Sequence, residues 1–552
     1  MALRHTLLQL AYLALALTTT AAPAAQQQAL LLNDDASTSP SSLLLGPQIR
    51  YAEQNAPHVF NALHAAMRQW DSSLKHNGMS FFAATIPDKT LLYHGTHTHK
   101  AVEGTEWLAF EIEHAENFAR TRGRGPGGRR PPPPGEGGPP GDGDGDGDSR
   151  GPPGEYGPPP TKRHANGILA EGNGYLHIYQ TKKTLSNLLF LDGMSAGKTS
   201  MGTLDTQDRV LCNLSSEAPG NGRGGAMGDY QRATQMCAFP GIDGIVRMEA
   251  GFEVILCNFS SGVELISAFQ RPTGEGAETY DLVQQFEYMR GIAARYEGIT
   301  AGRVTVDYSS MVSGFFYPLN LTNPDVEKRE LPRLPLEDKE GLLRLKRDVV
   351  DLFAPGGGAE NQKSVDWQGV TDMVVSRYAE RLQYLVANTT IQKRMLSEVN
   401  FLLSLFIDYK DTPINSGASI AQCTTHYLRP ITPVTEADHL IHASISTVSE
   451  RICSTLFTAR AKLLEDGING ETVADEVRKE IKSLIAYLNW STWLGCGKCE
   501  FDEVCFVAIW PWGGLEDHYK PGCVKENAIG SRRGYWGGFG GRSVGEDEGM
   551  RL

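Results

Sequence analysis

The stretch from residue 241 to 259, GIDGIVRMEAGFEVILCNF, decides the expected fold of the first half of the chain. Its apolar runs predict strands at 243–247 and 252–259, joined by a tight turn at 249–251. Glu253 stands at the head of the second strand, directly before three apolar residues. A carboxylate in this place is costly unless it lies in a cleft or has a partner. Glu253 is therefore a candidate functional residue.

Two earlier stretches carry side chains suited to a ligand site. Residues 91–96, LLYHGT, predict a strand that ends at His94 and Gly95, where a backbone without Cβ lets a ligand approach. Residues 106–119, EWLAFEIEHAENFA, predict a short strand containing Trp107, then a turn and a helix. With further strands expected at 174–180, 187–191 and 263–269, this part of the chain is predicted to be an α+β domain.

Taken in order, these motifs resemble the ADP-ribosyltransferase superfamily, in the branch marked by a His, an aromatic residue and a Glu. The resemblance covers residues of about 85–270 and is carried by His94-Gly95-Thr96, Trp107, AENFA at 115–119, GIDGIV at 241–246 and EVIL at 253–256. The family usually has Tyr at the aromatic position, where this chain has Trp107. The resemblance implies a split β-sheet domain that uses NAD as its substrate, with no metal.

The resemblance also implies a role for each matched residue. Glu253 would stabilise the positive charge that develops as the nicotinamide–ribose bond breaks, and His94 would hold the adenosine-side ribose. Gly95 and Thr96 would offer backbone groups to the nicotinamide amide, and Trp107 would stack on its ring. The acceptor of ADP-ribose would be either a protein side chain or water, and water would make the enzyme an NAD glycohydrolase.

Several other interpretations remain open at this stage. The fold can be kept without activity in a secreted interaction protein or effector, and the scarcity of NAD outside cells favours this alternative. A glycoside hydrolase would use a pair of carboxylates drawn from Glu106, Glu113 and Glu253. Glu249, in the turn, is a rival acid, and the HGTHTH run at 94–99 is a weak metal candidate.

The stretch LLFLDGMSAGKT at 188–199 is similar to a phosphate-binding loop. It has Asp192 where that loop requires a glycine, and an acid there would repel phosphate. Nucleotide triphosphate hydrolysis is therefore not expected. The net charge of −13 likewise excludes a general nucleic-acid or anionic-membrane binder.

The first residues have the features of a cleaved secretory signal, because a positive start precedes an apolar run too short to span a bilayer. Nine cysteines favour disulfides in an oxidising compartment, and the odd number leaves at least one thiol outside them. The last four cysteines predict a stapled module, with a zinc site through the C-x₂-C at 496–499 as the rival. N-glycosylation sequons lie at Asn213, Asn258, Asn320, Asn388 and Asn489. The chain is thus expected to be a secreted, extracellular glycoprotein.

Composition shifts divide the chain into segments. Residues 121–160 alone hold 14 of the 60 glycines and 12 of the 30 prolines, which predicts a disordered insert at 121–161 inside the α+β domain. Cys423 and Cys453 are placed to staple two helices of the second half. The expected order is a signal peptide at 1–24, a flexible N-terminus at 25–50, the α+β domain at 51–320, a linker at 321–340, an α-helical domain at 341–489, a disulfide-rich module at 490–525 and a Gly-rich tail at 526–552.

Overall fold

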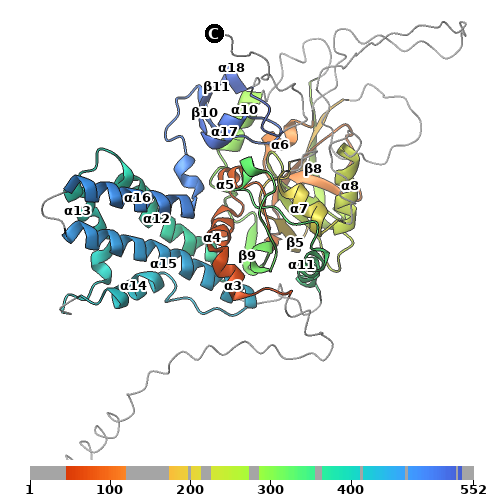
Figure 1. Ribbon diagram of the computed structural model, residues 1–552. Helices are drawn as coiled ribbons and strands as arrows, with labels where there is room; N and C mark the ends of the chain where they lie inside the picture. Colours follow the sequence, from red (N-terminus) through yellow and green to blue (C-terminus); the bar gives the residue numbers. More distant parts are fainter. Residues whose placement is uncertain are drawn as a thin grey trace, which may run out of the picture. The chain divides into compact units, whose positions relative to one another are not determined.

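A computed structural model describes residues 45–119, 173–196, 201–212, 225–272, 285–354, 364–410, 414–465, 470–529 and 532–536 (Figure 1). The expected signal peptide, the Gly/Pro-rich insert, the sequon at Asn213 and the GKT end of the phosphate-loop-like stretch lie outside these residues. The described residues all belong to one compact unit. The fold is mixed α/β, with a large mixed sheet.

The centre of the fold is a nine-stranded sheet with the order β8-β4-β2-β3-β7-β6-β5-β1-β9. All neighbouring strands in it pair antiparallel except β5 and β6, which are parallel. The strands are β1 Ser80–Ile86, β2 Leu91–Thr96, β3 Glu106–Ala109, β4 Tyr175–Thr181, β5 Leu185–Leu191, β6 Gly244–Met248, β7 Phe252–Leu256, β8 Val263–Gln270 and β9 Thr305–Ser313.

Pairing in this sheet is thinnest between β2 and β3, where Tyr93 and Ala109 form the single register pair. By contrast, β2 and β4 pair along six residues. The hydrogen-bonded order is nevertheless continuous from one edge to the other, so the structure has one large sheet where a split sheet was expected. The strands with the expected His, aromatic and Glu residues, β2, β3 and β7, are neighbours in this order.

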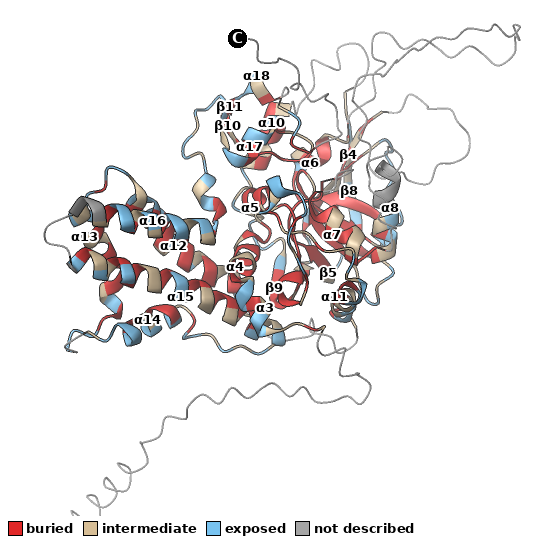
Figure 2. Cartoon of the chain, in the orientation of Figure 1, coloured by how far each residue is buried: buried red, intermediate tan, exposed pale blue. Residues whose placement is uncertain are grey.

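The middle of the sheet is buried because its strands are apolar on both faces. In β5, the four residues Leu188–Leu191 are all buried, and Phe190 packs against Phe82 of β1 with ring centroids 5.7 Å apart. Such continuous apolar runs are typical of strands covered on both sides. Figure 2 shows buried residues on the sheet and on the inward sides of the helices around it. Helices of this half are α3 Ile49–Gln54, α4 Ala56–Ala65, α5 Gln69–Leu74, α6 Ile112–Glu116, α7 Thr203–Val210, α8 Gly225–Met236, α9 Phe259–Gly262, α10 Gln285–Ala293 and α11 Lys339–Asp351.

The second half is helical, as its apolar spacing predicts. Its helices are α12 Trp367–Val386, α13 Gln392–Leu403, α14 Ser416–Thr425, α15 Glu436–Glu465 and α16 Gly470–Leu488. Cys423 of α14 and Cys453 of α15 form a disulfide with an S–S distance of 1.97 Å, which confirms the expected staple between helices. Helix α15 also contacts α3, α4 and β9, so the helices pack on the sheet half (Figure 1).

Asp438 in the first turn of α15 joins the two halves. Its Oδ1 accepts hydrogen bonds from Trp367 Nε1 on α12 (2.8 Å) and Ser309 Oγ on β9 (2.7 Å). Its Oδ2 accepts from the backbone of Thr435 (3.1 Å), whose hydroxyl in turn accepts from the Asp438 backbone (3.0 Å). This reciprocal capping fixes the start of α15 while the carboxylate binds the sheet and a neighbouring helix.

The expected linker at 321–340 packs onto the protein over part of its length. Leu331 and Leu334 are buried, and the Asn323 side chain donates to the Leu331 carbonyl at 2.8 Å. A short 3₁₀ turn, η3, covers Val326–Lys328; others are η2 Gly314–Phe316, η4 Ser404–Phe406 and η5 Ser491–Leu494. The boundaries of separate folding domains remain predictions.

The C-terminal region forms the expected stapled module. Strands β10 Glu503–Phe506 and β11 Gly522–Lys525 pair, with helices α17 Leu515–Tyr519 and α18 Glu526–Ile529 beside them. Disulfides join Cys496 to Cys505 and Cys499 to Cys523. The sulfurs of Cys496, Cys499 and Cys523 lie within 4.8 Å of one another, but all three belong to disulfides, so the zinc alternative gains no support.

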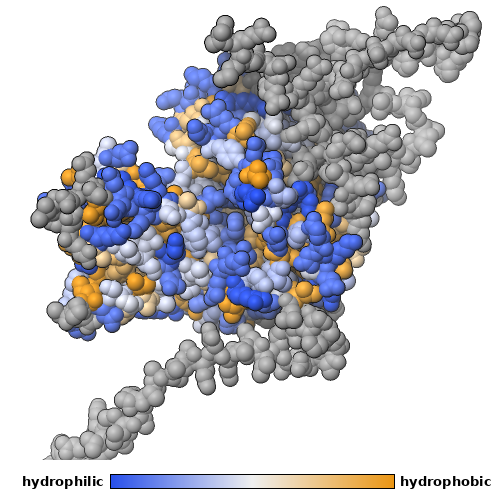
Figure 3. Space-filling view, viewed as in Figure 1, coloured by the Kyte–Doolittle hydropathy of each residue, from blue (hydrophilic) through white to orange (hydrophobic). Residues whose placement is uncertain are grey.

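Two aromatic residues of the expected Gly-rich tail, Tyr535 and Trp536, are buried. The Tyr535 hydroxyl contacts Nε2 of His76 at 2.7 Å, so this part of the tail is anchored. In the described part of the chain, no helix combines the length and apolar character needed to cross a membrane. The face in Figure 3 is largely hydrophilic, and its hydrophobic atoms gather in small spots.

The position of Asp438 leads to a test of stability. Asp438→Asn replaces an acceptor-only carboxylate by a group whose NH₂ faces hydrogen-bond donors, so unfolding should become easier by about 2–3 kcal/mol. Asp475→Asn is a suitable control, because Asp475 is exposed and makes a surface ion pair. In urea denaturation, the midpoint of Asp438→Asn should be lower than that of the wild type, and the midpoint of Asp475→Asn should be unchanged. Equal midpoints would mean that Asp438 does not join the two halves.

Candidate functional site

A buried cluster lies where β2, β3, β6, β7 and α6 meet. We call His94, Trp107, His114, Arg247 and Glu253 the His94–Glu253 cluster. Each member is less than 5% exposed. Three of them, His94, Trp107 and Glu253, are the residues expected from sequence to share one site. The other two bring charge and hydrogen bonding that the sequence motifs did not predict.

Glu253 is held by Arg247 across the hairpin of β6 and β7. The register places the two residues opposite each other, and Arg247 Nε donates to Glu253 Oε1 at 2.6 Å. Burial alone would raise the pKa of Glu253, but the Arg247 guanidinium and the nearby His114 imidazole lower it below its usual value. Glu253 is therefore an ionised carboxylate inside the core, the paired arrangement that its place on an apolar strand requires.

His114 lies on the five-residue helix α6 and faces the second oxygen of Glu253. Its Nε2 is 3.7 Å from Oε2, which is too long for a hydrogen bond, and its Nδ1 contacts the Tyr288 hydroxyl of α10 at 2.8 Å. The helix predicted at the end of residues 106–119 contained this histidine, but the motifs gave it no role. Because His114 stands four residues before Phe118, helical spacing places both on the same face, and this spacing was the available signal.

Trp107 connects His94 to the rest of the cluster. Its ring centroid lies 5.0 Å from that of His94 and 5.7 Å from that of His114, both edge-on. Register places Tyr93, not His94, level with Ala109, and side chains alternate between faces. The ring contact shows that His94 nevertheless reaches Trp107. His94 and Glu253 are thus linked through Trp107 and His114.

His94 is an uncharged, buried imidazole. Burial, with a smaller effect from His177 opposite it on β4, lowers the pKa of His94 to about 3. Among the described residues, its Nδ1 has no hydrogen-bond partner. An unsatisfied buried nitrogen is costly, so a ligand hydroxyl at this position would be stabilising.

Gly95 is needed for packing in this structure. A Cβ at Gly95 would lie 2.2 Å from the Ala115 carbonyl oxygen and 2.6 Å from the Ala119 nitrogen. The space beside Gly95, where a ligand was expected, is therefore filled by the backbone around α6. Thr96 is half-buried and lies opposite Tyr175 of β4. The roles proposed for Gly95 and Thr96 toward nicotinamide remain predictions.

Of the competing acids, Glu106 points away from Glu253, whereas Glu249 lies near it. Glu106 lies opposite Leu256 while Glu253 lies opposite Ala109, so strand alternation places the two carboxyl groups on opposite faces. Burial raises the pKa of Glu106 to about 7, and the Trp107 backbone N–H donates to it. Glu249 contacts Arg247 at 3.8 Å in the turn. Among described residues, the only group with metal-like spacing is the cysteine set of the tail, not the HGTHTH histidines.

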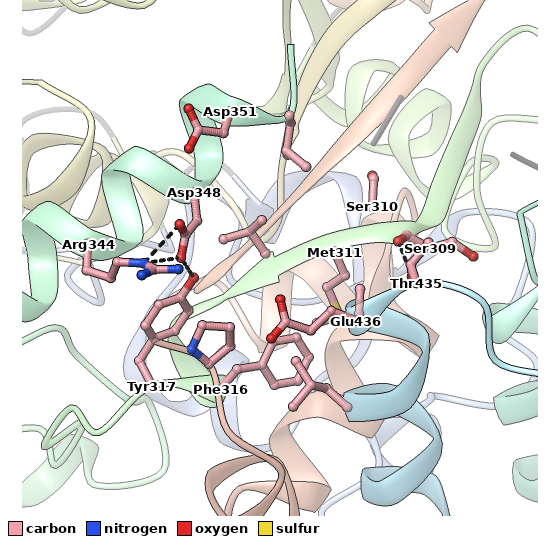
Figure 4. Close-up of a pocket in the computed structure, with 15 residues that line it drawn as sticks. Ser309, Ser310, Met311, Phe316, Tyr317, Arg344, Asp348, Asp351, Thr435 and Glu436 are labelled. Carbon is pink, nitrogen blue, oxygen red and sulfur yellow. Dashed lines mark hydrogen bonds and ion pairs between the residues drawn. The ribbon is translucent and has the colours of Figure 1, made fainter. Parts of the chain in front are cut away.

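A second hollow lies away from this cluster, between β9, α11 and the start of α15 (Figure 4). Its volume is about 280 Å³. Asp348 lies between Arg344, whose Nε donates to it at 2.9 Å, and the Tyr317 hydroxyl at 2.6 Å. Burial and the nearby Asp348 raise the pKa of Glu436 at its rim. The carboxylate of Asp348 is therefore already satisfied by Arg344 and Tyr317.

The Arg247–Glu253 pair yields a test by substitution. Arg247→Met leaves a buried carboxylate without its guanidinium and should destabilise the fold by about 3–5 kcal/mol. The double variant Arg247→Met/Glu253→Leu removes both charges and should recover most of that loss. Arg290→Met, which breaks an exposed pair with Glu287, should cost less than about 1 kcal/mol. Denaturant unfolding measures all three.

The same pair has a pH dependence with a definite sign. Because the folded-state pKa of Glu253 is lowered, its contribution to stability is complete above the unfolded value of about 4.3 and is lost as pH falls through the folded value. Because the double variant lacks this carboxylate, the wild type should lose stability relative to the double variant as pH falls below about 4. If Arg247→Met costs no more stability than Arg290→Met, the result would contradict a buried ionic pair.

Comparison with known proteins identifies the relatives of this chain. Residues 49–277 match the protein family described as the YPL277C N-terminal domain, a range that contains the whole His94–Glu253 cluster. The uncharacterized protein YOR389W of Saccharomyces cerevisiae is 27% identical over 83% of this chain and 82% of its own length. The uncharacterized protein YPL277C of the same yeast is 30% identical over 60% of this chain and 74% of its own length. No solved structure matches the chain. The chain belongs to the YPL277C family.

Proposed function

We propose that the His94–Glu253 cluster acts on NAD, either transferring ADP-ribose to a protein or hydrolysing NAD with water. The observation that carries the proposal is a buried carboxylate on β7, paired with Arg247, together with the indole of Trp107 on the adjacent strand β3 and the imidazole of His94 on the next strand, β2. These are the three side chains that the resemblance to ADP-ribosyltransferases implies, on neighbouring strands.

The chemistry follows from the surroundings of Glu253. Breaking the nicotinamide–ribose bond builds positive charge on the ribose, and a fixed carboxylate in a water-poor site stabilises that charge far better than water does. Arg247 holds Oε1 through a 2.6 Å contact, while Nε2 of His114 lies 3.7 Å from Oε2, beyond hydrogen-bond distance. Oε2 is thus the oxygen suited to a ribose hydroxyl. Trp107 would stack on the nicotinamide ring, and the unpartnered Nδ1 of His94 suits a hydroxyl of the second ribose.

Access to the cluster is the main requirement of this proposal. His94, Trp107 and Glu253 are nearly inaccessible, so NAD reaches them only if the layer formed by α6 and Phe118 moves. This closure favours a second candidate function, a secreted interaction protein that keeps the fold without activity. In that case the Arg247–Glu253 pair and the edge-on ring contacts of Trp107 serve stability alone.

We also propose that the chain is exported and glycosylated. Four disulfides are typical of proteins from oxidising compartments, and Cys212 is the remaining, buried thiol. The four described sequon asparagines, Asn258, Asn320, Asn388 and Asn489, are all exposed. Exposure is required because the transferred glycan is bulky and hydrophilic.

The enzymatic proposal is tested by nicotinamide release from NAD. Glu253→Gln keeps the shape of the side chain but removes its charge, and release should fall by about 100-fold or more. The matched control is Glu264→Gln, which changes a half-exposed glutamate of the edge strand β8 and should leave release unchanged. Circular dichroism of each variant confirms that it is folded.

Three outcomes would decide the matter. A fall for Glu253→Gln alone supports the catalytic proposal. Equal release by the wild type and both folded variants overturns the role of Glu253. No nicotinamide release by the disulfide-bonded wild type favours the second candidate, and Trp107→Ala then reports a loss of stability only.

Export predicts a measurable change in mass. The chain secreted from a eukaryotic host should shift to lower mass on treatment with an N-glycosidase, and the shift should vanish when all five sequon asparagines are changed to Gln. Asn415→Gln is the control, because Asn415 caps α14 but is not part of a sequon. Retention of the chain inside the cells, or a mass that the glycosidase does not change, would contradict export with glycosylation.

A further inference from the structure

A line of side chains runs from the disulfide-rich module to Glu253. Trp512 of the module contacts Tyr288 of α10 edge-on, with ring centroids 5.5 Å apart. The Tyr288 hydroxyl is 2.8 Å from Nδ1 of His114, and Nε2 of His114 faces Oε2 of Glu253 at 3.7 Å. Helix α10 also contacts β10 and α6, so it bridges the module and the cluster (Figure 1).

The hydrogen-bonding capacities of these groups determine the tautomer of His114. An ionised carboxylate only accepts hydrogen bonds, so the nitrogen that faces Glu253 is favoured in its protonated form. In a neutral imidazole Nδ1 is then the acceptor, and the Tyr288 hydroxyl must be the donor. Burial and the nearby Glu249 and Glu253 raise the pKa of Tyr288 well above its usual value, so the phenol keeps the proton that it donates.

The imidazole ring is also fixed in orientation. It stacks on Tyr288 with an interplanar angle of 15° and meets the rings of Trp107 and Phe118 edge-on. On the fourth side lies Gly251, where an added Cβ would be 2.9 Å from Cγ of His114. Packing therefore leaves the ring one orientation, with Nε2 toward Glu253.

We propose that His114 and Tyr288 are positioning residues for Glu253, with Tyr288 fixing the Nε2–H tautomer of His114 and Trp512 of the disulfide-rich module holding Tyr288 in place. Arg247 anchors Oε1, and the Nε2–H of His114 orients Oε2 toward the substrate without a tight hydrogen bond that substrate would have to break. The catalytic consequence rests on the proposed NAD chemistry; the tautomer does not.

The first test reads the tautomer directly. Nitrogen NMR of the full chain labelled at histidine, with His114→Gln to assign the signal, should show His114 as the Nε2–H form. Tyr288→Phe removes the donor and should shift His114 to a mixture of tautomers. Tyr296→Phe is the matched control, since Tyr296 follows α10 and donates to the Cys505 carbonyl of the same module at 2.7 Å without touching His114. An Nδ1–H signal or a doubly protonated imidazolium in the wild type, or an unchanged spectrum in Tyr288→Phe, would overturn the proposal.

The second test reads the effect on turnover. If the cluster releases nicotinamide, Tyr288→Phe should lower kcat by about 10-fold with little change in KM, whereas Tyr296→Phe should not. An equal loss in both variants would mean that Tyr288 acts through general stability and would overturn the positioning role. Absence of release in the wild type removes the NAD proposal alone, because the NMR result still decides the tautomer.

Discussion

The buried ion pair between Arg247 and Glu253 is the constraint around which the sheet half is organised. Two opposite charges inside an apolar hairpin are tolerable only while they stay paired, because an unpaired charge there would cost several kcal/mol. The register of β6 and β7 is thereby specified, since a slip of one residue would turn the two side chains to opposite faces. With β7 fixed, β3 brings Trp107 beside the pair and α6 closes over it with His114.

The helical half depends on a similar polar anchor. Strand β9 contributes Ser309 to the carboxylate of Asp438, which also receives the Trp367 indole and caps α15. Because one carboxylate satisfies donors from three elements, α12, α15 and β9 have a single relative arrangement. The long helix α15 then spans from the sheet edge to α14, where the Cys423–Cys453 disulfide holds it. Polar groups, rather than apolar area alone, therefore specify how the two halves meet.

Local pattern predicted much of this fold, and its failures have physical causes. Strands β4 to β8 lie within a few residues of their expected places, and helices α12 to α16 lie inside the expected helical domain at 341–489, because apolar spacing dominates there. Strand β9, TVDYSSMVS, was missed because its buried serines break the apolar alternation and are satisfied by Asp438 and Ser80, far away in sequence. His114 was missed for the same reason, since its partner Glu253 is far away in sequence. Arg247 lies opposite Glu253 across the predicted hairpin, so the turn at 249–251 was the signal that could have identified this pair. The motifs identified the three residues of the candidate site but not the side chains that hold them.

The distribution of disulfides connects the compartment to the candidate site. Cys237–Cys257 ties the turn after α8 to the residue that follows β7, the strand of Glu253. Cys496–Cys505 and Cys499–Cys523 hold the module that presents Trp512 to Tyr288. Three of the four disulfides thus brace elements in contact with the His94–Glu253 cluster, and only Cys423–Cys453 serves the helical half. A disulfide stabilises a fold mainly by restricting the unfolded chain, and it also limits local opening of the elements that it joins. The cluster would consequently be held most firmly in an oxidising compartment, which is where the sequence predicts that the protein works.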